Sequence, residues 1–132
     1  MLRQPPFSHA ASAVIPIDNG ASAWRTNWVD DTIAADAVKH LQKRDHADGV
    51  LLLVYPVVSG EFTQRVIEAY RGDTVCVVGT QNGNGYTGFR DLCVDEWMTR
   101  DGRKWELRAR VPVPSFAGKD DALFVFKRVI DA

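Results

Sequence analysis

The fold is decided by the stretch Val50-Leu51-Leu52-Leu53-Val54-Tyr55-Pro56, a continuous apolar run that does not alternate with polar residues. A strand with this pattern is typical of a parallel sheet whose two faces are both covered. The segment Thr74–Val78 has the same character, and Gly79 ends it. Both strands are therefore expected to be buried on both faces.

Helical patterns surround these two strands. The expected helix starts are polar residues that can cap a helix: Asp31 or Thr32, Ser59, and Thr87. Each start is followed by apolar residues at helical spacing, as in Ile33, Ala37 and Leu41. Alternation of strands and helices in this order predicts an α/β protein with helices on both faces of a mostly parallel sheet.

The C-terminal third predicts two adjacent strands. Trp105–Val113 alternates between apolar and polar residues, which places its apolar residues on one face. Ala122–Ile130 is the last expected strand, and no helical pattern separates the two, so we expect an antiparallel hairpin at one edge of the sheet. Ala13–Ile17 is the first expected strand. These elements predict an N-terminal arm over residues 1–12 and one domain over residues 13–132.

The composition limits the classes of partner. The chain has 132 residues with 16 Lys and Arg against 17 Asp and Glu, which argues against a nucleic-acid binder that works through a general basic surface. No run approaches the roughly 20 apolar residues of a membrane helix, so no membrane partner is expected. The two cysteines, Cys76 and Cys93, lie in apolar segments without close spacing, which favours buried thiols and a cytoplasmic location.

Ligands of parallel α/β sheets bind beyond the carboxyl ends of the strands, which directs attention to three segments. Asp18 can accept hydrogen bonds from a ribose, or it can cap its own turn. Tyr55 and Pro56 can present a rigid aromatic ring to a flat substrate, or the tyrosine can be a core residue with its hydroxyl at the rim. The residues Gly83–Gly88 match G-x-G-x-x-G but begin four residues after the strand ends at Gly79, which favours a flexible loop or a substrate-gating loop. Neither the histidines nor the cysteines have metal-ligand spacing, so no metal is expected.

Several segments together resemble the C-terminal part of a largely uncharacterised family of methyltransferase-like proteins with a Rossmann-like fold. The segments that carry the likeness are Val50–Pro56, Ala69–Gly79, Gly83–Gly88 with Thr87-Gly88-Phe89, Val111-Pro112 and Asp121–Arg128. The resemblance covers roughly residues 13 to 130. It implies a three-layer, methyltransferase-type sheet that is mostly parallel and N-terminally truncated, with a C-terminal antiparallel hairpin.

The resemblance also implies roles for individual residues. Asp18 would hold the ribose of S-adenosylmethionine, and Tyr55 and Pro56 would border the transferred methyl group. The substrate would be covered by a loop comprising Asn82, Gly83, Asn84, Gly85 and Tyr86. The sequence departs from the family where Val57 and Val58 replace a second proline and an aromatic residue, and where Thr80 replaces a glutamate.

The family's glycine-rich cofactor turn has no counterpart before Asp18, because the seventeen preceding residues include no glycine. The strand that belongs with that turn is the central one in the family. We therefore expect a degenerate, non-catalytic member that acts as an interaction or regulatory module. A homo-oligomer, a partner chain completing the sheet, or a rearranged sheet would compensate for the missing strand. The alternatives are an active S-adenosylmethionine-dependent methyltransferase acting on an unknown small molecule, and an α/β domain that binds a phosphate or nucleotide through the Gly79–Gly88 loop.

Overall fold

The structure is a computed structural model that describes residues 14–18, 33–44, 46–56, 61–81, 93–100, 104–114 and 120–129. The chain divides into two compact units, residues 1–40 and 41–132. In the first unit, β1 (Ile17–Asp18) pairs in parallel with β2 (Ile33–Ala34). The Ile33 amide donates to the Pro16 carbonyl at 2.8 Å, and the Ala35 amide donates to the Asp18 carbonyl at 3.1 Å.

The first helix, α1 (Ala37–Lys43), spans the boundary between the two units. Its first turn is capped by Asp36, whose carboxylate accepts a hydrogen bond from the Lys39 amide at 3.1 Å. The helix was expected to begin at Asp31 or Thr32, which lie outside the described residues. That expectation is wrong, because Ile33 belongs to β2 and, among the described residues, Asp36 accepts the hydrogen bond from a first-turn amide.

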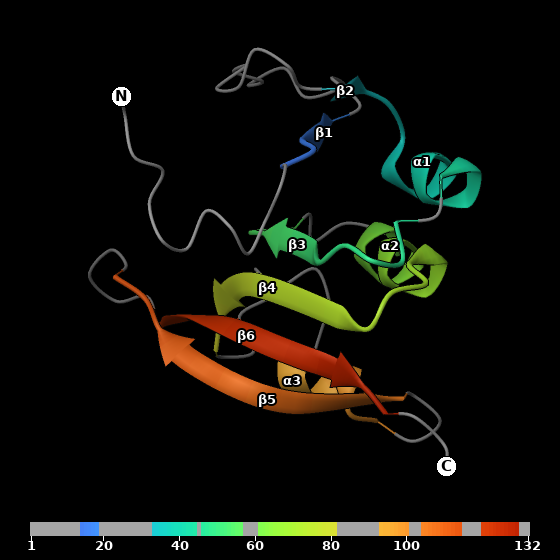
Figure 1. Ribbon diagram of the computed structural model, residues 1–132. Helices are drawn as coiled ribbons and strands as arrows, with labels where there is room; N and C mark the ends of the chain where they lie inside the picture. The colour runs from blue at the N-terminus through green and yellow to red at the C-terminus, as the bar shows by residue number, and fades with distance from the viewer. Residues whose placement is uncertain are drawn as a thin grey trace, which may run out of the picture. The chain divides into compact units, whose positions relative to one another are not determined.

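The second unit contains a four-stranded sheet in the order β3-β4-β6-β5 (Figure 1). Its strands are β3 (Leu51–Val54), β4 (Thr74–Thr80), β5 (Trp105–Pro112) and β6 (Asp121–Arg128). Strands β3 and β4 are parallel, whereas β6 is antiparallel to both β4 and β5. The expected three-layer, mostly parallel, methyltransferase-type sheet is therefore wrong. The last strand pairs directly with β4, which makes two of the three pairings in this sheet antiparallel.

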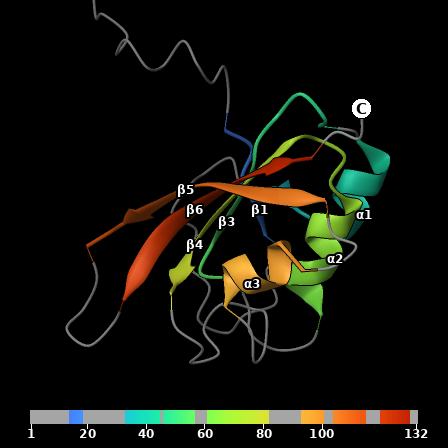
Figure 2. The ribbon, with the colours of Figure 1, turned by 90° about the horizontal axis from the view of Figure 1, so that it is seen from below.

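One face of this sheet is covered by α2 (Phe62–Ala69) and α3 (Val94–Met98), which lie on the same side in Figure 2. The Arg110 side chain lies over the Phe124 ring and pairs with Asp95 at the start of α3. The fully buried side chains of this core come from both helices and from alternate strand positions: Thr63, Val66, Val75, Val77, Val94, Met98, Phe124 and Phe126. We call this side of the sheet the covered face.

The opposite side of the sheet is equally apolar but is not buried. We call it the open face. Its nine apolar residues are Val50, which directly precedes β3, and, from the strand register, Leu52, Val54, Cys76, Val78, Ala109, Val111, Leu123 and Val125. The charged residues Glu106, Asp121 and Lys127 lie on the same side of the sheet, toward its ends. All nine side chains are partly or largely exposed. Leu52 and Val54 each keep 56% of their surface exposed, so the expected burial of β3 on both faces is wrong. The physical reason is that α2 and α3 both pack on the covered face.

A β-bulge in β5 decides which residues reach the open face. Leu107 lies opposite Phe126 and Ala109 lies opposite Val125, so the extra residue, Arg108, has no partner in the register. Phe126 and Val125 face opposite sides of the sheet, and Leu107 and Ala109 therefore do so as well. The sequence predicted that all apolar residues of this strand share one face. That prediction is wrong because a bulge shifts the alternation by one residue.

Candidate functional site

Tyr55 lies directly after β3, at the carboxyl end of the parallel pair. Its φ angle of 46° falls in the left-handed region, where a tyrosine is uncommon and pays about 1–2 kcal/mol. The Tyr55 amide donates to the Val78 carbonyl at 2.8 Å, which holds the strained backbone against β4. The side chain remains 49% exposed. The aromatic ring predicted from the sequence is thus present at the strand end, beside half-buried Pro56.

The Tyr55 hydroxyl donates a hydrogen bond of 2.7 Å to the carboxylate of Asp121, the first residue of β6. Asp121 is only 4% exposed, although it carries a carboxylate. The hydrogen bond to Asp121 raises the pKa of Tyr55, so the hydroxyl stays protonated and its proton stays engaged. Tyr55 can present its flat ring to a ligand, but its hydroxyl proton is already hydrogen-bonded to the Asp121 carboxylate.

A second polar pair flanks this one. The Gln81 side-chain amide donates to the Asp120 carboxylate at 2.8 Å, and the Gln81 backbone amide donates to the Asp120 carbonyl at 2.7 Å. These contacts fasten the end of β4 to the residue that precedes β6. Tyr55, Gln81 and Asp121 therefore form a polar rim at the carboxyl end of β3 and β4.

The remaining predicted site residues belong to the first unit or to segments outside the described residues. Asp18 lies at the end of β1 in the first unit, whereas Tyr55 belongs to the second unit. The predicted substrate loop, Asn82 to Tyr86, lies outside the described residues, as does Thr87. Within the described ranges, no group of three His, Cys, Asp or Glu side chains is placed to hold a metal ion.

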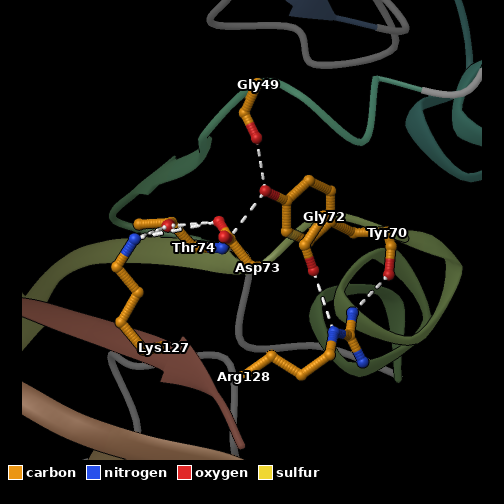
Figure 3. A network of polar contacts seen from close by, with 7 residues as sticks. All are labelled: Gly49, Tyr70, Gly72, Asp73, Thr74, Lys127 and Arg128. Carbon is orange, nitrogen blue, oxygen red and sulfur yellow. Dashed lines mark hydrogen bonds and ion pairs between the residues drawn. The ribbon is translucent and has the colours of Figure 1, made fainter. Parts of the chain in front are cut away.

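The opposite end of the sheet holds a denser polar network (Figure 3). The Tyr70 hydroxyl donates to the Gly49 carbonyl and accepts a hydrogen bond of 3.3 Å from the Thr74 amide. Burial is the main cause that raises the pKa of Tyr70. Through its hydroxyl, Tyr70 connects the segment before β3 with the start of β4 and the end of α2.

Arg128 completes this network on the covered face. Its guanidinium donates to the carbonyls of Gly72 and Tyr70, each at 2.9 Å, and so satisfies acceptors just beyond the C-terminus of α2 (Figure 3). The same guanidinium lies 4.4 Å from the centre of the Trp105 ring, which stacks on Tyr70 at a centroid distance of 6.4 Å. These contacts fasten α2 to the sheet, which identifies this end as structural.

Lys127 lies beside Arg128 on the strand but faces the other side. Its ammonium donates to the Thr74 hydroxyl at 2.6 Å and lies 3.8 Å from the Asp73 carboxylate. The hydrogen bond from the Thr74 hydroxyl, followed by the charge of Lys127, lowers the pKa of Asp73. Lys127 thus marks the charged margin of the open face at this end.

The two edge strands of the sheet differ in their protection. β5 carries Arg108 and Arg110, ends in Pro112 and contains the bulge, all of which discourage pairing with another strand. β3 has the sequence Leu-Leu-Leu-Val and carries no charge. No strand of the second unit's sheet pairs with the outer edge of β3 within the described residues. The open face therefore continues to an uncharged edge.

Sequence reasoning found the ring at position 55 and missed the features that set its environment. Asp121 lies 66 residues from Tyr55 along the chain, and no local sequence pattern predicts their contact. The open face had a signal in the sequence, namely the absence of alternation in Val50–Tyr55. That pattern indicates that both faces of the strand are apolar, but it does not indicate which face is covered by other parts of the protein.

Comparison of the chain with models of known protein families, with curated proteins and with solved structures finds no match. The methyltransferase-like resemblance therefore stays a prediction. Among the described helices, none combines the length and the apolar character needed to cross a membrane.

Proposed function

We propose that this chain is a protein-interaction module that binds its partner through the open face of the sheet. The observation that carries the proposal is the exposure of apolar side chains on the open face, from the segment before β3 to β5. Val50 is 61% exposed, Leu52 and Val54 are 56% exposed, and Val111 is 48% exposed. Contiguous apolar surface of this kind is costly in water and is typical of interaction sites.

The bulge in β5 supports this interpretation. With uninterrupted alternation from Trp105 and Leu107, Arg108 and Arg110 would both project from the open face. The extra residue instead turns Arg110 to the covered face, where it pairs with Asp95, and places Ala109 and Val111 on the open face. The bulge thereby removes Arg110 from the open face, whereas Glu106, which pairs with Arg108 at 3.7 Å, lies on that side.

Site-specific photo-crosslinking in cells tests the proposal. A benzophenone amino acid replaces Leu52 on the open face in one variant and Gln42, exposed on α1, in the control. We expect a discrete product larger than the 14.7 kDa chain from position 52 alone, and its loss when Val54→Lys is added. Equal products from both positions, or none from position 52, would contradict the proposed function.

A second candidate function is binding of S-adenosylmethionine at Asp18. The observation that favours it is the position of Asp18 at the carboxyl end of β1, which is paired in parallel with β2. A carboxylate at such a strand end is suited to accept hydrogen bonds from ribose hydroxyls. Calorimetric titration with S-adenosylmethionine tests this role. We expect heat that is lost in Asp18→Asn, and absence of heat at millimolar cofactor would remove the candidate.

A further inference from the structure

Tyr55 combines a strained backbone with a hydrogen bond to a buried carboxylate. Its φ angle is 46°, and its hydroxyl donates to Asp121 at 2.7 Å. We propose that Tyr55 is a conformational latch over Asp121. In the closed form the hydrogen bond holds the left-handed backbone. When that bond is lost, the backbone of residue 55 becomes extended and the Asp121 carboxylate is uncovered.

The left-handed backbone determines which side of the sheet the Tyr55 side chain reaches. Side chains of an extended strand alternate between the two faces, so the residue after Val54 would lie on the covered face. Asp121 lies on the opposite side, which it shares with Leu123 and Val125 of β6. An extended Tyr55 would therefore direct its hydroxyl away from Asp121. The left-handed backbone and the hydrogen bond consequently depend on each other.

Pro56 makes the extended form the preferred alternative. A proline disfavours helical backbone in the residue before it and favours extended backbone there. The Cβ atom of a tyrosine disfavours a positive φ in addition. Residue 55 therefore leaves the left-handed region unless its contacts hold it there. Two such contacts are the hydroxyl bond to Asp121 and the bond of 2.8 Å from the Tyr55 amide to the Val78 carbonyl.

The latch adjoins a polar pair that is buried at one end of the open face. Thr80 and Asp121 are register partners, and they are only 3% and 4% exposed. The next pair on this side, Val78 and Leu123, is partly exposed although both residues are apolar. A buried carboxylate costs free energy unless a donor satisfies it, and the Tyr55 hydroxyl is such a donor. Opening the latch exposes this carboxylate to other donors at the rim of the open face.

Hydrogen exchange of the residue-55 amide in the full chain tests the backbone change. Tyr55→Phe keeps the ring but removes the hydroxyl, so we expect the protection factor of this amide to fall about 10-fold as the backbone becomes extended. Tyr55→Gly removes the whole side chain, yet its amide should stay protected because glycine adopts a positive φ readily. Amides of β4 report any general unfolding. Unchanged protection in Tyr55→Phe, or an equal loss in both variants, would overturn the proposal.

Carbodiimide labelling of carboxylates, read by mass spectrometry, tests the uncovering of Asp121. Its exposed neighbour Asp120 is the internal reference. In the parent chain we expect Asp120 to be labelled about 10-fold faster than buried Asp121. Tyr55→Phe should remove most of this difference by accelerating Asp121 alone. If Asp121 stays protected in Tyr55→Phe, the ring still covers it and the latch is refuted. Both measurements use the chain alone, so their outcome is independent of any partner on the open face.

Discussion

The two faces of the four-stranded sheet are similarly apolar and yet differ in exposure. On β6, Phe124 and Phe126 are 0% exposed, whereas their neighbours Leu123 and Val125 on the open face remain partly exposed. The difference arises from the packing of α2 and α3 on one side, because the side-chain chemistry is alike on both. An apolar strand pattern thus indicates that both faces of a sheet carry apolar side chains. The arrangement of the helices determines which of the two faces is buried.

Alanine substitution at adjacent positions of β6 gives the largest expected contrast. Phe124→Ala should lower the free energy of unfolding by about 3–5 kcal/mol, because it leaves a cavity among fully buried side chains. Val125→Ala should cost about 1 kcal/mol or less in the monomer, since its side chain is partly in water. Urea denaturation at low protein concentration measures both. Similar losses at the two positions would show that the open face is already covered.

A second contrast compares the neighbouring cations at the end of β6. Arg128→Met removes two hydrogen bonds to the carbonyls of Tyr70 and Gly72 and should cost about 1–2 kcal/mol. Lys127→Met removes a hydrogen bond to the Thr74 hydroxyl and an exposed ion pair with Asp73, and should cost under about 1 kcal/mol. Thermal unfolding checks the order of the two losses. The reverse order would contradict the structural role given to the Arg128 network.

Single deletions in β5 examine how the bulge assigns residues to the two faces. Deleting Arg108 removes only the unpaired residue, so its neighbours keep their faces, and stability should change by less than about 1 kcal/mol. Deleting Arg110 removes the pair with Asp95 and leaves Arg108 to lie opposite Val125, which should cost about 1–3 kcal/mol. Chemical denaturation distinguishes the two. Equal losses would place the extra residue elsewhere in the strand.

The smallest expected effect concerns the rim of the open face. The hydrogen bond to Asp121 raises the pKa of Tyr55 above its ordinary value of 10.0. Since the folded value is the higher one, this contribution to stability is fully present below pH 10.0 and is lost as the pH rises through the folded pKa. Because burial also raises the pKa of Tyr70, ultraviolet titration should show late ionisation of both Tyr55 and Tyr70, and Tyr55→Phe should remove one of these two late steps. Unchanged titration in that variant would reject the assignment.

The local elements of the second unit were largely predictable from the sequence. The apolar runs Val50–Tyr55 and Thr74–Val78 overlap β3 and β4, and the antiparallel pairing of β5 with β6 agrees with the expected hairpin. Such features depend on neighbouring residues and on short connections. They are consequently visible in periodicity and turn residues.

The sheet topology and the site environment were not predictable in the same way. The pairing of β6 with β4 brings Thr74 opposite Lys127 and Thr80 opposite Asp121, contacts that depend on the register of strands distant in sequence. The bulge at Arg108 cannot be predicted from the sequence, because apolar and polar residues still alternate along a strand that contains one extra residue. Asp18 belongs to the other unit, and its role in cofactor binding stays a prediction.

The Tyr70 side chain occupies the space that a side chain at position 72 would need. A Cβ atom at position 72 would overlap the hydroxyl and ring of Tyr70. The tyrosine can reach the Gly49 carbonyl only while position 72 lacks a side chain. The two positions should therefore covary among related chains, with glycine retained wherever the aromatic residue is present. A larger residue at 72 would signal that the turn between α2 and β4 follows a different path.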